Sequence, residues 1–432
     1  MNYSRKQVRT FSERLYHCSN EGQVKEFFKV TDLASVIGRT EEFSPVELES
    51  VPLESSAGRI LAEDMAADDN LPAFSRSTMD GYAVQAASTF GASEGTPAYL
   101  NVKGTISMGS PPLFSVKRGE ATRISTGGML PKGSDSVVMI EHTDKLDDTT
   151  IEVYRSVAPG QHTIERGEDF RFGQTVIHAG QILRPQETGL LAAFGHKVVP
   201  VFKQPEIAII SSGDEIVSVD SRPAMGQIRD ISSYTLAGLV IGAGGKPVHY
   251  GIVPDSYEEL FQTCNAALAQ TDMVLISGGS SVGTRDFTID VLTNLADSQI
   301  LVHGISIKPG KPTILAKSGV KAVWGLPGHV VSAMVVFKVV VQPFILRIAG
   351  LLQPPQSDFT IQAYLTRNIE SAQGRTDFVR VRLEQKNGEV RAEPLLGKSG
   401  LLNTMVKADG LIEIDAHSEG LDAGSTVAVM LL

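Results

Sequence analysis

Between Pro205 and His329 the chain repeats one pattern three times, an apolar run that ends in a loop rich in Gly, Ser and Asp. The runs with their loops read EIAIISSGDEI, DMVLISGGSSVGTRD and AVWGLPGH. Helical stretches such as SSYTLAGLVIGAGG and SYEELFQTCNAALAQ lie between them. Apolar strands that alternate with helices are typical of a parallel sheet covered by helices on both faces. Ligands bind such sheets outside the carboxyl ends of the strands, where these loops must lie.

The rest of the chain shows a β pattern. From Ala98 to about Tyr154, short alternating segments are cut by Gly and Pro, which predicts a small β-rich unit. From Gln353 to Leu432 the β pattern returns, and Asn387-Gly388 is a good hairpin turn there. A chain of 432 residues is too long for one compact core, so two to four domains are expected.

Charge and composition exclude several classes of function. The 39 basic and 49 acidic residues give a formal charge of −10, which disfavours nonspecific binding to nucleic acid or to an anionic membrane. The longest apolar run, from Ala333 to Leu346, is interrupted by Lys, Gln and Pro, so we expect no membrane span. Cys18 and Cys264 form no metal-binding spacing, and the N-terminus lacks the apolar core of a signal peptide. We therefore expect a cytoplasmic protein.

The stretch PAFSRSTMDGYAV, from Pro72 to Val84, places Asp80 directly before Gly81. Asp-Gly is among the commonest dipeptides of hairpin turns, so a turn is one interpretation. The other interpretation is that Asp80 faces a ligand, because a buried strand seldom begins with so many polar side chains. The residues alone leave both interpretations open.

Acidic and small residues follow the apolar runs, at the predicted rim of the sheet. They are Ser212, Gly213, Asp214 and Glu215 after the first run, Asp255 after the run PVHYGIVPD, and Gly278, Gly279, Ser281 and Asp286 after the next. Converging carboxylates suit a hard cation such as Mg²⁺, held through one or two carboxylates and ligand oxygens. The alternative is that these acids cap the helices that follow. For Asp286 both remain open, whereas the adjacent pair Asp214 and Glu215 favours a functional role.

SIKPGKPT, from Ser306 to Thr313, offers Lys308 and Lys311 around a Pro-Gly turn. Ammonium groups and backbone N–H groups together make a good cradle for an anion. A surface turn flanked by lysines is the alternative. The Walker A pattern is not present in the sequence, so this is no P-loop.

GSSVG, from Gly279 to Gly283, matches the GxSxG pattern of a serine hydrolase and follows a strand. Ser281 would be the nucleophile, and a later histidine, His303, His329 or His417, would supply the base. No acid is placed obviously between Ser281 and a base, so the hydrolase is the less favoured hypothesis.

Nine segments, taken together and in order, resemble the molybdopterin molybdenumtransferase family, that is, bacterial MoeA and the E domain of gephyrin. They are STMDGYAV, ISTGGMLPKGSDSVVM, RGEDF, SSGDEI, GQIRD, SGGSSVG, IKPGKP, GLPGHVVSA and GRTDFVRVRL. The resemblance implies an elongated, multi-domain α/β and β protein with a central three-layer α/β domain of mostly parallel sheet, the molybdopterin-binding fold. Its implied parts are a split N-terminal and linker domain (1–73 plus 168–203), a β-rich second domain (74–167), the α/β domain (204–350) and a C-terminal β-barrel-like domain (351–432).

The resemblance also implies an activity, the insertion of molybdenum from molybdate into adenylylated molybdopterin with Mg²⁺-assisted release of AMP, in molybdenum cofactor biosynthesis. It implies a homodimer whose cleft lies between the α/β domain of one subunit and the β-rich domain of the other. The expected partners are molybdopterin adenylyltransferase and molybdoenzyme apoproteins or their chaperones. Molybdate and pyrophosphate are both anions, so bringing them together needs cationic groups, while acidic residues hold the metal ion.

The resemblance assigns roles to the candidate residues. Asp80 becomes a cleft acid contributed across the dimer interface, which answers the question about its turn. The implied catalytic residues are Asp80, Thr126, Asp169, Glu215, Asp255, Asp286 and Lys308, and Glu168 joins the acidic set. The implied metal ligands are Glu215, Asp255 and Asp286. The implied substrate-binding residues are Ser212, Gly213, Asp214, Gly278, Gly279, Ser281, Gly283, Lys311, Pro327, Arg380 and Ser399.

Some positions depart from the family's pattern. His329-Val330 replaces Asn-Pro, Gly304 replaces a cation, and Ser232 and Thr284 replace polar or acidic residues. Each buried polar partner lost would weaken binding by about 1–3 kcal/mol. The departures motivate an alternative hypothesis, a divergent paralogue that binds molybdopterin or a partner without insertion, or one that handles tungstate.

Overall fold

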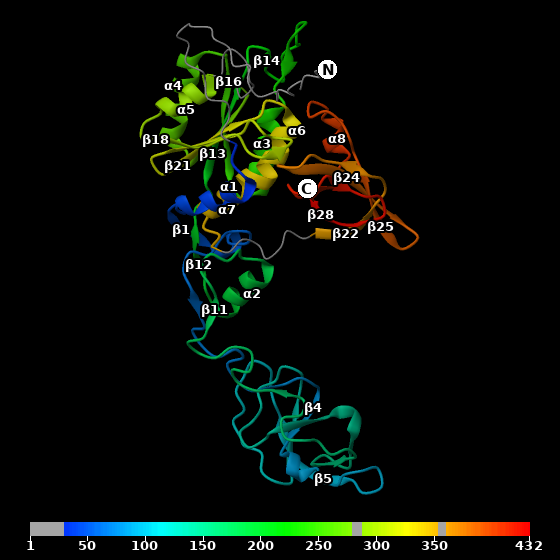
Figure 1. Cartoon of the computed structure of the whole chain (residues 1–432). Coiled ribbons are helices and arrows are strands. Elements are labelled where there is room, and N and C mark those ends of the chain that lie inside the picture. The colour runs from blue at the N-terminus through cyan, green and yellow to red at the C-terminus, as the bar shows by residue number, and fades with distance from the viewer. Residues whose placement is uncertain (1–29, 279–286, 353–359) are drawn as a thin grey trace, which may run out of the picture.

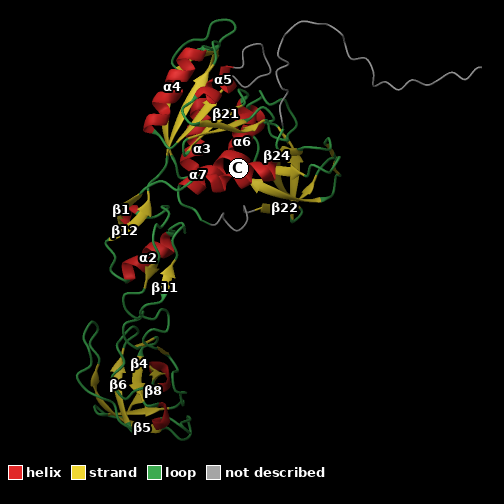
Figure 2. Ribbon diagram, turned by 60° about the vertical axis from the view of Figure 1, so that its left-hand side comes forward, coloured by secondary structure: helices red, strands yellow, loops and turns green. Residues whose placement is uncertain are grey.

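The computed structural model describes residues 30–278, 287–352 and 360–432 of an elongated molecule (Figure 1). The α/β part and a C-terminal barrel lie together at one end, and a β-rich part lies at the other end. A narrow linker part, which contains α2 (Pro185–Ala193), connects the two ends. Figure 2 shows the same separation from a second direction.

The α/β part is built on a six-stranded sheet in the order β16-β13-β17-β21-β20-β18. The first four strands are parallel, and β20 and β18 continue the sheet in antiparallel pairings. The strands are β13 (Glu206–Ser212), β16 (Lys246–Val253), β17 (Met273–Ser277), β18 (Ser298–His303), β20 (Ile314–Ser318) and β21 (Lys321–Leu326). Strands β13, β17 and β21 are the three apolar runs of the sequence. They are apolar on both faces because helices cover both sides of the sheet.

Two helical layers enclose this sheet. One layer packs against Leu275 and Trp324 and contains α1 (Leu33–Gly38), α3 (Ser232–Gly242), α6 (Val330–Val336) and α7 (Gln342–Ile348). The other packs against Val274 and Val323 and contains α4 (Tyr257–Gln270) and α5 (Phe287–Asn294). Adjacent strand residues face opposite layers, as the two-residue period of a strand requires. The predicted three-layer α/β architecture is confirmed.

Residues Val330–Ile348 form one long helical segment, in which a π-helical turn (Phe337–Val341) joins α6 to α7. By length and composition this segment is apolar enough to cross a membrane, but 61% of its most apolar window is buried within the fold. Its Phe344 ring packs edge-on against Trp324, with 5.0 Å between the ring centroids. These are the contacts of a core helix.

The C-terminal part is a closed five-stranded barrel, so the predicted β-barrel-like domain is confirmed. Its strands follow the order β24-β25-β22-β28-β26, and β26 pairs back with β24. They are β22 (Thr360–Leu365), β24 (Thr376–Lys386), β25 (Glu389–Pro394), β26 (Gly410–Ile414) and β28 (Thr426–Leu431). The pair β23 (Ile369–Glu370) and β27 (Gly420–Leu421) and the short α8 (Asn403–Val406) complete this part.

One further strand joins the α/β part to the barrel. β19 (Ile307–Lys308) precedes β20 in the chain, yet it pairs in parallel with β24 of the barrel. In this pairing Lys308 lies opposite Asp377. The α/β part and the barrel are therefore connected by a backbone ladder as well as by the covalent chain.

The β-rich part contains a six-stranded sheet in the order β7-β4-β6-β5-β9-β8. Its strands are β4 (Gly81–Val84), β5 (Ala98–Thr105), β6 (Glu120–Ile124), β7 (Ser136–Met139), β8 (Thr143–Lys145) and β9 (Thr150–Val153). Asp80-Gly81 is no hairpin turn, because the preceding strand β3 (Arg76–Ser77) pairs with β10 (Thr163–Ile164) instead of β4. Gly81 is needed for another reason: a β-carbon there would lie 1.9 Å from the carbonyl oxygen of Val138.

The linker part is formed by two separate passages of the chain. β1 (Leu48–Pro52) pairs with β12 (Val198–Phe202), and β2 (Met65–Ala66) pairs with β11 (Thr175–Ile177), both antiparallel. Its small core includes Leu61, Leu183 and Leu191. The division of the chain into domains at residues 73, 167, 203 and 350 stays a prediction.

Candidate functional site

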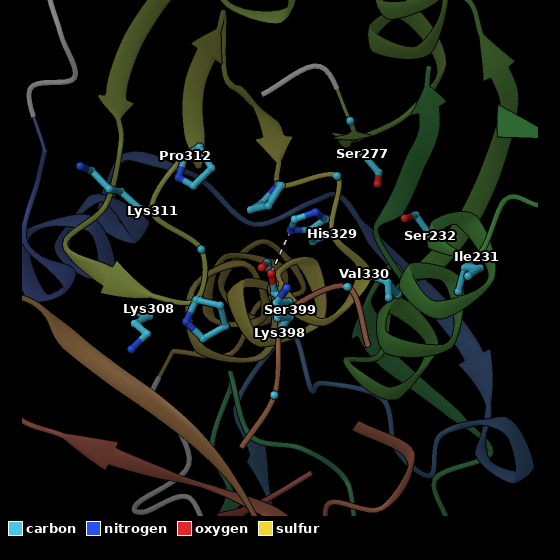
Figure 3. Close-up of a pocket in the computed structure, with 18 of the residues that line it drawn as sticks. Ile231, Ser232, Ser277, Lys308, Lys311, Pro312, His329, Val330, Lys398 and Ser399 are labelled. Carbon is cyan, nitrogen blue, oxygen red and sulfur yellow. Dashed lines mark hydrogen bonds between the residues drawn. The ribbon is translucent and has the colours of Figure 1, made fainter. Parts of the chain in front are cut away.

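A pocket of about 1270 Å³ lies between the carboxyl ends of the parallel strands and the barrel (Figure 3). The loops after β13, β17 and β21 form one wall, together with the short strands β14 (Ile216–Val217) and β15 (Ile228–Arg229). Strand β24 and residues 396–400 of the barrel form the other wall. The pocket lies where the strand order of an α/β sheet predicts a ligand. The predicted site residues that line it are Ser212, Gly213, Glu215, Asp255, Gly278, Lys308, Lys311, Pro327, Arg380 and Ser399.

Three carboxylates belong to the α/β wall, those of Glu215, Asp230 and Asp255. The Ser212 hydroxyl donates a hydrogen bond of 3.1 Å to Oδ1 of Asp255, and the Asp255 backbone N–H donates one of 3.0 Å to Oδ1 of Asp214. The Glu215 carboxylate folds back over Gly213, where a β-carbon would lie 2.8 Å from its Oε2. Asp214 therefore holds the loop of Asp255, while Glu215 and Asp255 present oxygens to the pocket.

The oxygen donors of Glu215 and Asp255 fit a magnesium ion that is held partly by the ligand. Mg²⁺ is usually bound through one or two carboxylates together with phosphate oxygens and waters. Within residues 30–278, 287–352 and 360–432, no group of three or more His, Cys, Asp or Glu side chains forms a complete metal cage. Asp286, the third expected ligand, lies outside the described residues.

A cationic cluster belongs to the junction between β19 and β24. Nζ of Lys308 lies 3.4 Å from Oδ2 of Asp377, and Nε of Arg375 donates a hydrogen bond of 2.8 Å to Oδ1 of the same carboxylate. The Asp377 side chain is only 4% exposed, whereas those of Lys308 and Arg375 are 58% and 38% exposed. Neither Arg375 nor Asp377 was predicted from the sequence as a site residue.

Arg380 is a second cation of the barrel wall, and it organises the loop beside it. The Nη2 atom of Arg380 donates to the carbonyl oxygens of Leu395 and Gly397, at 3.4 and 3.1 Å. Nε is buried and has no hydrogen-bond partner among the described residues. Burial lowers the pKa of Arg380, because a charged guanidinium is poorly solvated there.

His329 contacts the barrel wall directly. Its Nδ1 lies 2.9 Å from Oγ of Ser399, and Figure 3 shows the two side chains facing each other across the pocket. His329 occupies the N-cap position of α6 without a capping bond from its side chain, and Val330 is the first residue of that helix. The sequence marked His329 as a departure and as a candidate base of the hydrolase hypothesis, but its contact with Ser399 was not foreseen.

Ser232, one of the departures from the family's pattern, is the first residue of α3. Asp230 is 8% exposed and accepts hydrogen bonds of 3.0 Å from the Ser211 hydroxyl and from the Ser233 backbone N–H. It therefore caps the beginning of α3 and ties that helix to β13. Ser232, the departing residue, lines the pocket beside it.

Five predicted site residues do not line the pocket of their own chain: Asp80, Thr126, Glu168, Asp169 and Asp214. Oδ1 of Asp80 accepts hydrogen bonds from the Thr126 backbone N–H at 2.7 Å and from its hydroxyl at 3.2 Å. This pair joins the beginning of β4 to the end of β6, at the end of the molecule away from the pocket (Figure 1). Oε2 of Glu168 accepts from the Glu165 backbone N–H at 2.7 Å, and the Asp169 backbone N–H donates to the Leu71 carbonyl oxygen at 3.1 Å.

The remaining candidates, Gly279, Ser281, Gly283 and Asp286, lie outside the described residues, as does Thr284. The hydrolase hypothesis for Ser281 therefore stays a prediction. His329, one of its three candidate bases, has its Nδ1 in contact with Ser399.

Three family models together match most of the chain. The MoeA N-terminal region (domain I and II) matches residues 25–195, the "Probable molybdopterin binding domain" matches residues 208–347, and the MoeA C-terminal region (domain IV) matches residues 362–432. The chain belongs to the MoeA family.

Relatives within the MoeA family carry names that describe an enzyme. The molybdopterin molybdenumtransferase of Haemophilus influenzae is 35% identical over 391 residues, which cover 89% of this chain and 94% of the relative. That of Bacillus subtilis is 32% identical over 390 residues, which cover 89% and 90%. The crystal structure of the molybdopterin biosynthesis MoeA protein from Pyrococcus horikoshii OT3 matches with a TM-score of 0.82 at 32% identity, and it covers 94% of this chain and 100% of that chain.

Proposed function

We propose that this MoeA-family protein is a molybdopterin molybdenumtransferase. It inserts molybdenum from molybdate into adenylylated molybdopterin and releases AMP, as a step of molybdenum cofactor biosynthesis. The observation that carries the proposal is one pocket lined both by the carboxylates Glu215 and Asp255 and by the cations Lys308, Arg375 and Arg380. The names of the relatives support the same activity.

The charges of the pocket suit two anionic substrates. Lys308, Arg375 and Arg380 offset the negative charge of molybdate and of a phosphoanhydride, which would otherwise repel each other. Their donors are held by the surrounding fold, so little reorganisation accompanies the reaction. Catalysis then consists mainly of positioning and charge neutralisation, and it needs no covalent nucleophile.

Glu215 and Asp255 are the residues that would hold Mg²⁺ in this pocket. The bound ion would polarise the phosphoanhydride whose cleavage releases AMP. The Ser212 hydroxyl donates to the Asp255 carboxylate, and the backbone N–H of Asp255 donates to Asp214. Together these two bonds keep Asp255 in place. The barrel-side cations then remain available for the anion.

We further propose that the protein is a cytoplasmic homodimer, in which the β-rich end of one subunit faces the pocket of the other. The remote, exposed pair Asp80 and Thr126 supports this arrangement, because the two residues hydrogen-bond to each other far from their own pocket. Molybdopterin adenylyltransferase would supply the adenylylated substrate. Molybdoenzyme apoproteins or their chaperones would accept the product.

The test is molybdate-dependent release of AMP from adenylylated molybdopterin by the purified protein. Lys308→Met should abolish most of the release, whereas Lys246→Met should not. Lys246 is a matched control because it lies at the beginning of β16, at the edge of the sheet away from the pocket, in a surface ion pair with Glu206. Absence of AMP release by the wild type at any molybdate concentration, with the substrate bound, would refute the proposal.

A second candidate function keeps the pocket but changes its use. His329 contacts Ser399 where the family pattern has Asn, and this contact favours a paralogue that binds the pterin without inserting molybdenum, or one that handles tungstate. Complementation of a strain that lacks its molybdenumtransferase, scored by a molybdoenzyme activity, separates this candidate from the first. The same AMP assay with tungstate in place of molybdate tests the metal.

A further inference from the structure

The buried carboxylate of Asp377 connects the two parts of the protein at the pocket. Its Oδ1 accepts from Nε of Arg375, and its Oδ2 lies 3.4 Å from Nζ of Lys308. Nη2 of Arg375 also lies 3.5 Å from Oδ2. The two cations, one from the α/β part and one from the barrel, therefore share one oxygen atom.

The backbone fixes this arrangement independently of the side chains. Lys308 and Asp377 are paired residues of the parallel strands β19 and β24. The Thr376 N–H donates a hydrogen bond of 2.9 Å to the Ser306 carbonyl oxygen, and the Ser306 hydroxyl donates one of 3.1 Å to the Gly374 carbonyl oxygen. The segment that carries Arg375 and Asp377 is thereby held against the segment that carries Lys308.

The exposures show which groups face a ligand. Lys308, Arg375 and Asp377 all line the pocket, but the Asp377 side chain is only 4% exposed, whereas the two cations keep a large exposed fraction. An ammonium group has three N–H donors and a guanidinium has five, so one carboxylate leaves several donors of this pair available. Two cations balanced by one anion keep a net positive charge. Such a cluster suits a tetrahedral oxyanion, which offers several acceptors at short range.

We propose that Asp377 is a positioning residue that holds Lys308 and Arg375 together as one two-cation site for a tetrahedral oxyanion of the substrates. The inference rests on the proposed function, and it adds Arg375 to the binding residues. The oxyanion is either molybdate or a phosphate group of the adenylylated substrate, because the recognition chemistry is the same. Asp377 also lines the pocket, but its side chain is almost fully buried against the two cations and acts through them.

A purely structural role for Asp377, as a bond between barrel and α/β part, makes a different prediction. Loss of such a bond would lower stability and would affect activity to the same extent whether or not Lys308 is present. A positioning role requires the effects of changing Asp377 and Lys308 to be coupled. A double-mutant cycle measures this coupling.

The kinetic test uses Asp377→Asn, which keeps the shape of the side chain and an oxygen that can accept from Arg375. Its amide N–H₂ would face Nζ of Lys308, so that ammonium loses its anchor. We expect kcat for AMP release to fall about ten- to hundredfold, the usual effect of a misplaced catalytic group. In the Lys308→Met background the same change should lower kcat less than about threefold. Equal effects of Asp377→Asn in both backgrounds would overturn the proposal.

Asp409→Asn is a matched control in the barrel. Oδ2 of Asp409 accepts a hydrogen bond of 2.7 Å from the Leu383 N–H, and Asp409 does not line the pocket. This variant should lower the thermal midpoint of unfolding without lowering kcat. A fall in kcat as large as that of Asp377→Asn would mean that the barrel as a whole, and not Asp377, sets the activity, and the proposal would fail.

Equilibrium binding identifies the oxyanion and does not depend on catalysis. Sodium molybdate alone and AMP alone are titrated into wild type, Asp377→Asn and Arg375→Met. At least tenfold weaker binding of molybdate to both variants would assign the site to molybdate, and the same result with AMP would assign it to phosphate. Unchanged or tighter binding of both anions, or wild-type binding of neither, would overturn the two-cation site. If binding follows the proposal but the wild type releases no AMP, the proposed function fails while the site stands.

Discussion

His329 and Ser399 connect opposite walls of the pocket through a contact of 2.9 Å between Nδ1 and Oγ. His329 directly precedes α6 of the α/β part, and Ser399 belongs to the barrel loop that Arg380 holds by its carbonyl oxygens. The contact therefore sets the position of a loop that borders the ligand.

Replacement of His329 should loosen this loop without unfolding the protein. A neutral hydrogen bond contributes about 0.5–1.5 kcal/mol, so His329→Ala should raise KM for the adenylylated substrate about two- to tenfold. Ser399→Ala should do the same, and the double variant should be no worse than either single one, because both changes remove one contact. Steady-state kinetics of AMP release measure these effects. His178→Ala is the control, since this side chain is 74% exposed in the linker part. Fully additive effects would contradict the shared contact.

The carboxylate wall should determine the magnesium requirement. Glu215→Gln and Asp255→Asn each remove one charged oxygen donor, and the loss of a charge-assisted contact should raise the Mg²⁺ concentration for half-maximal AMP release about tenfold. A magnesium titration at saturating substrates measures the shift. Asp220→Asn, an exposed acid outside the pocket lining, should leave it unchanged. An unchanged magnesium requirement in both pocket variants would show that the metal is held elsewhere.

Restoring the family's residue should destabilise the protein at position 304, whereas the family's residues should be tolerated at positions 329 and 330. Gly304 has a φ of +95°, a conformation that side chains with a β-carbon rarely adopt. Gly304→Lys should therefore destabilise the protein by about 1–3 kcal/mol, measured by urea unfolding. His329→Asn with Val330→Pro should be tolerated, because Asn is a good N-cap and Pro suits the first position of a helix. The double variant is thus the sharper test of whether restoring the family pattern raises activity. Unaltered stability of Gly304→Lys would contradict this reasoning.

Mixing two inactive variants tests the proposed dimer. Asp80→Asn should damage the site through the β-rich end, and Lys308→Met should damage it through the pocket. After subunit exchange, half of the dimers contain one chain of each kind, and each of these has one intact site. The mixture should therefore recover about a quarter of the wild-type activity. No recovery, with subunit exchange shown independently, would place Asp80 outside the partner's site.

The sequence predicted those elements whose signal is local. The runs that became β13, β17 and β21 were apolar throughout, which only burial on both faces explains. Asn387 and Gly388 have φ values of 54° and 83° and form the two-residue turn between β24 and β25, as their dipeptide predicts. The position of the pocket followed from the parallel order of the strands.

Features that depend on distant pairing were not predicted. Asp377 reads as an ordinary strand residue, and nothing in its neighbourhood indicates that Lys308, 69 positions earlier, will lie beside it. Asp80-Gly81 has the composition of a turn, but Gly81 is required by the close approach of Val138 from another strand. In each case the partner comes from a distant part of the chain, where a local pattern carries no information.

The ladder between β19 and β24 also limits how far the barrel can move relative to the α/β part. Phe378 and Leu411 of the C-terminal part belong to the same buried cluster as Trp324 of the α/β sheet. Main-chain bonds and a shared apolar core therefore hold the two parts together beside Lys308. We expect this cation to keep its place while a substrate enters and leaves.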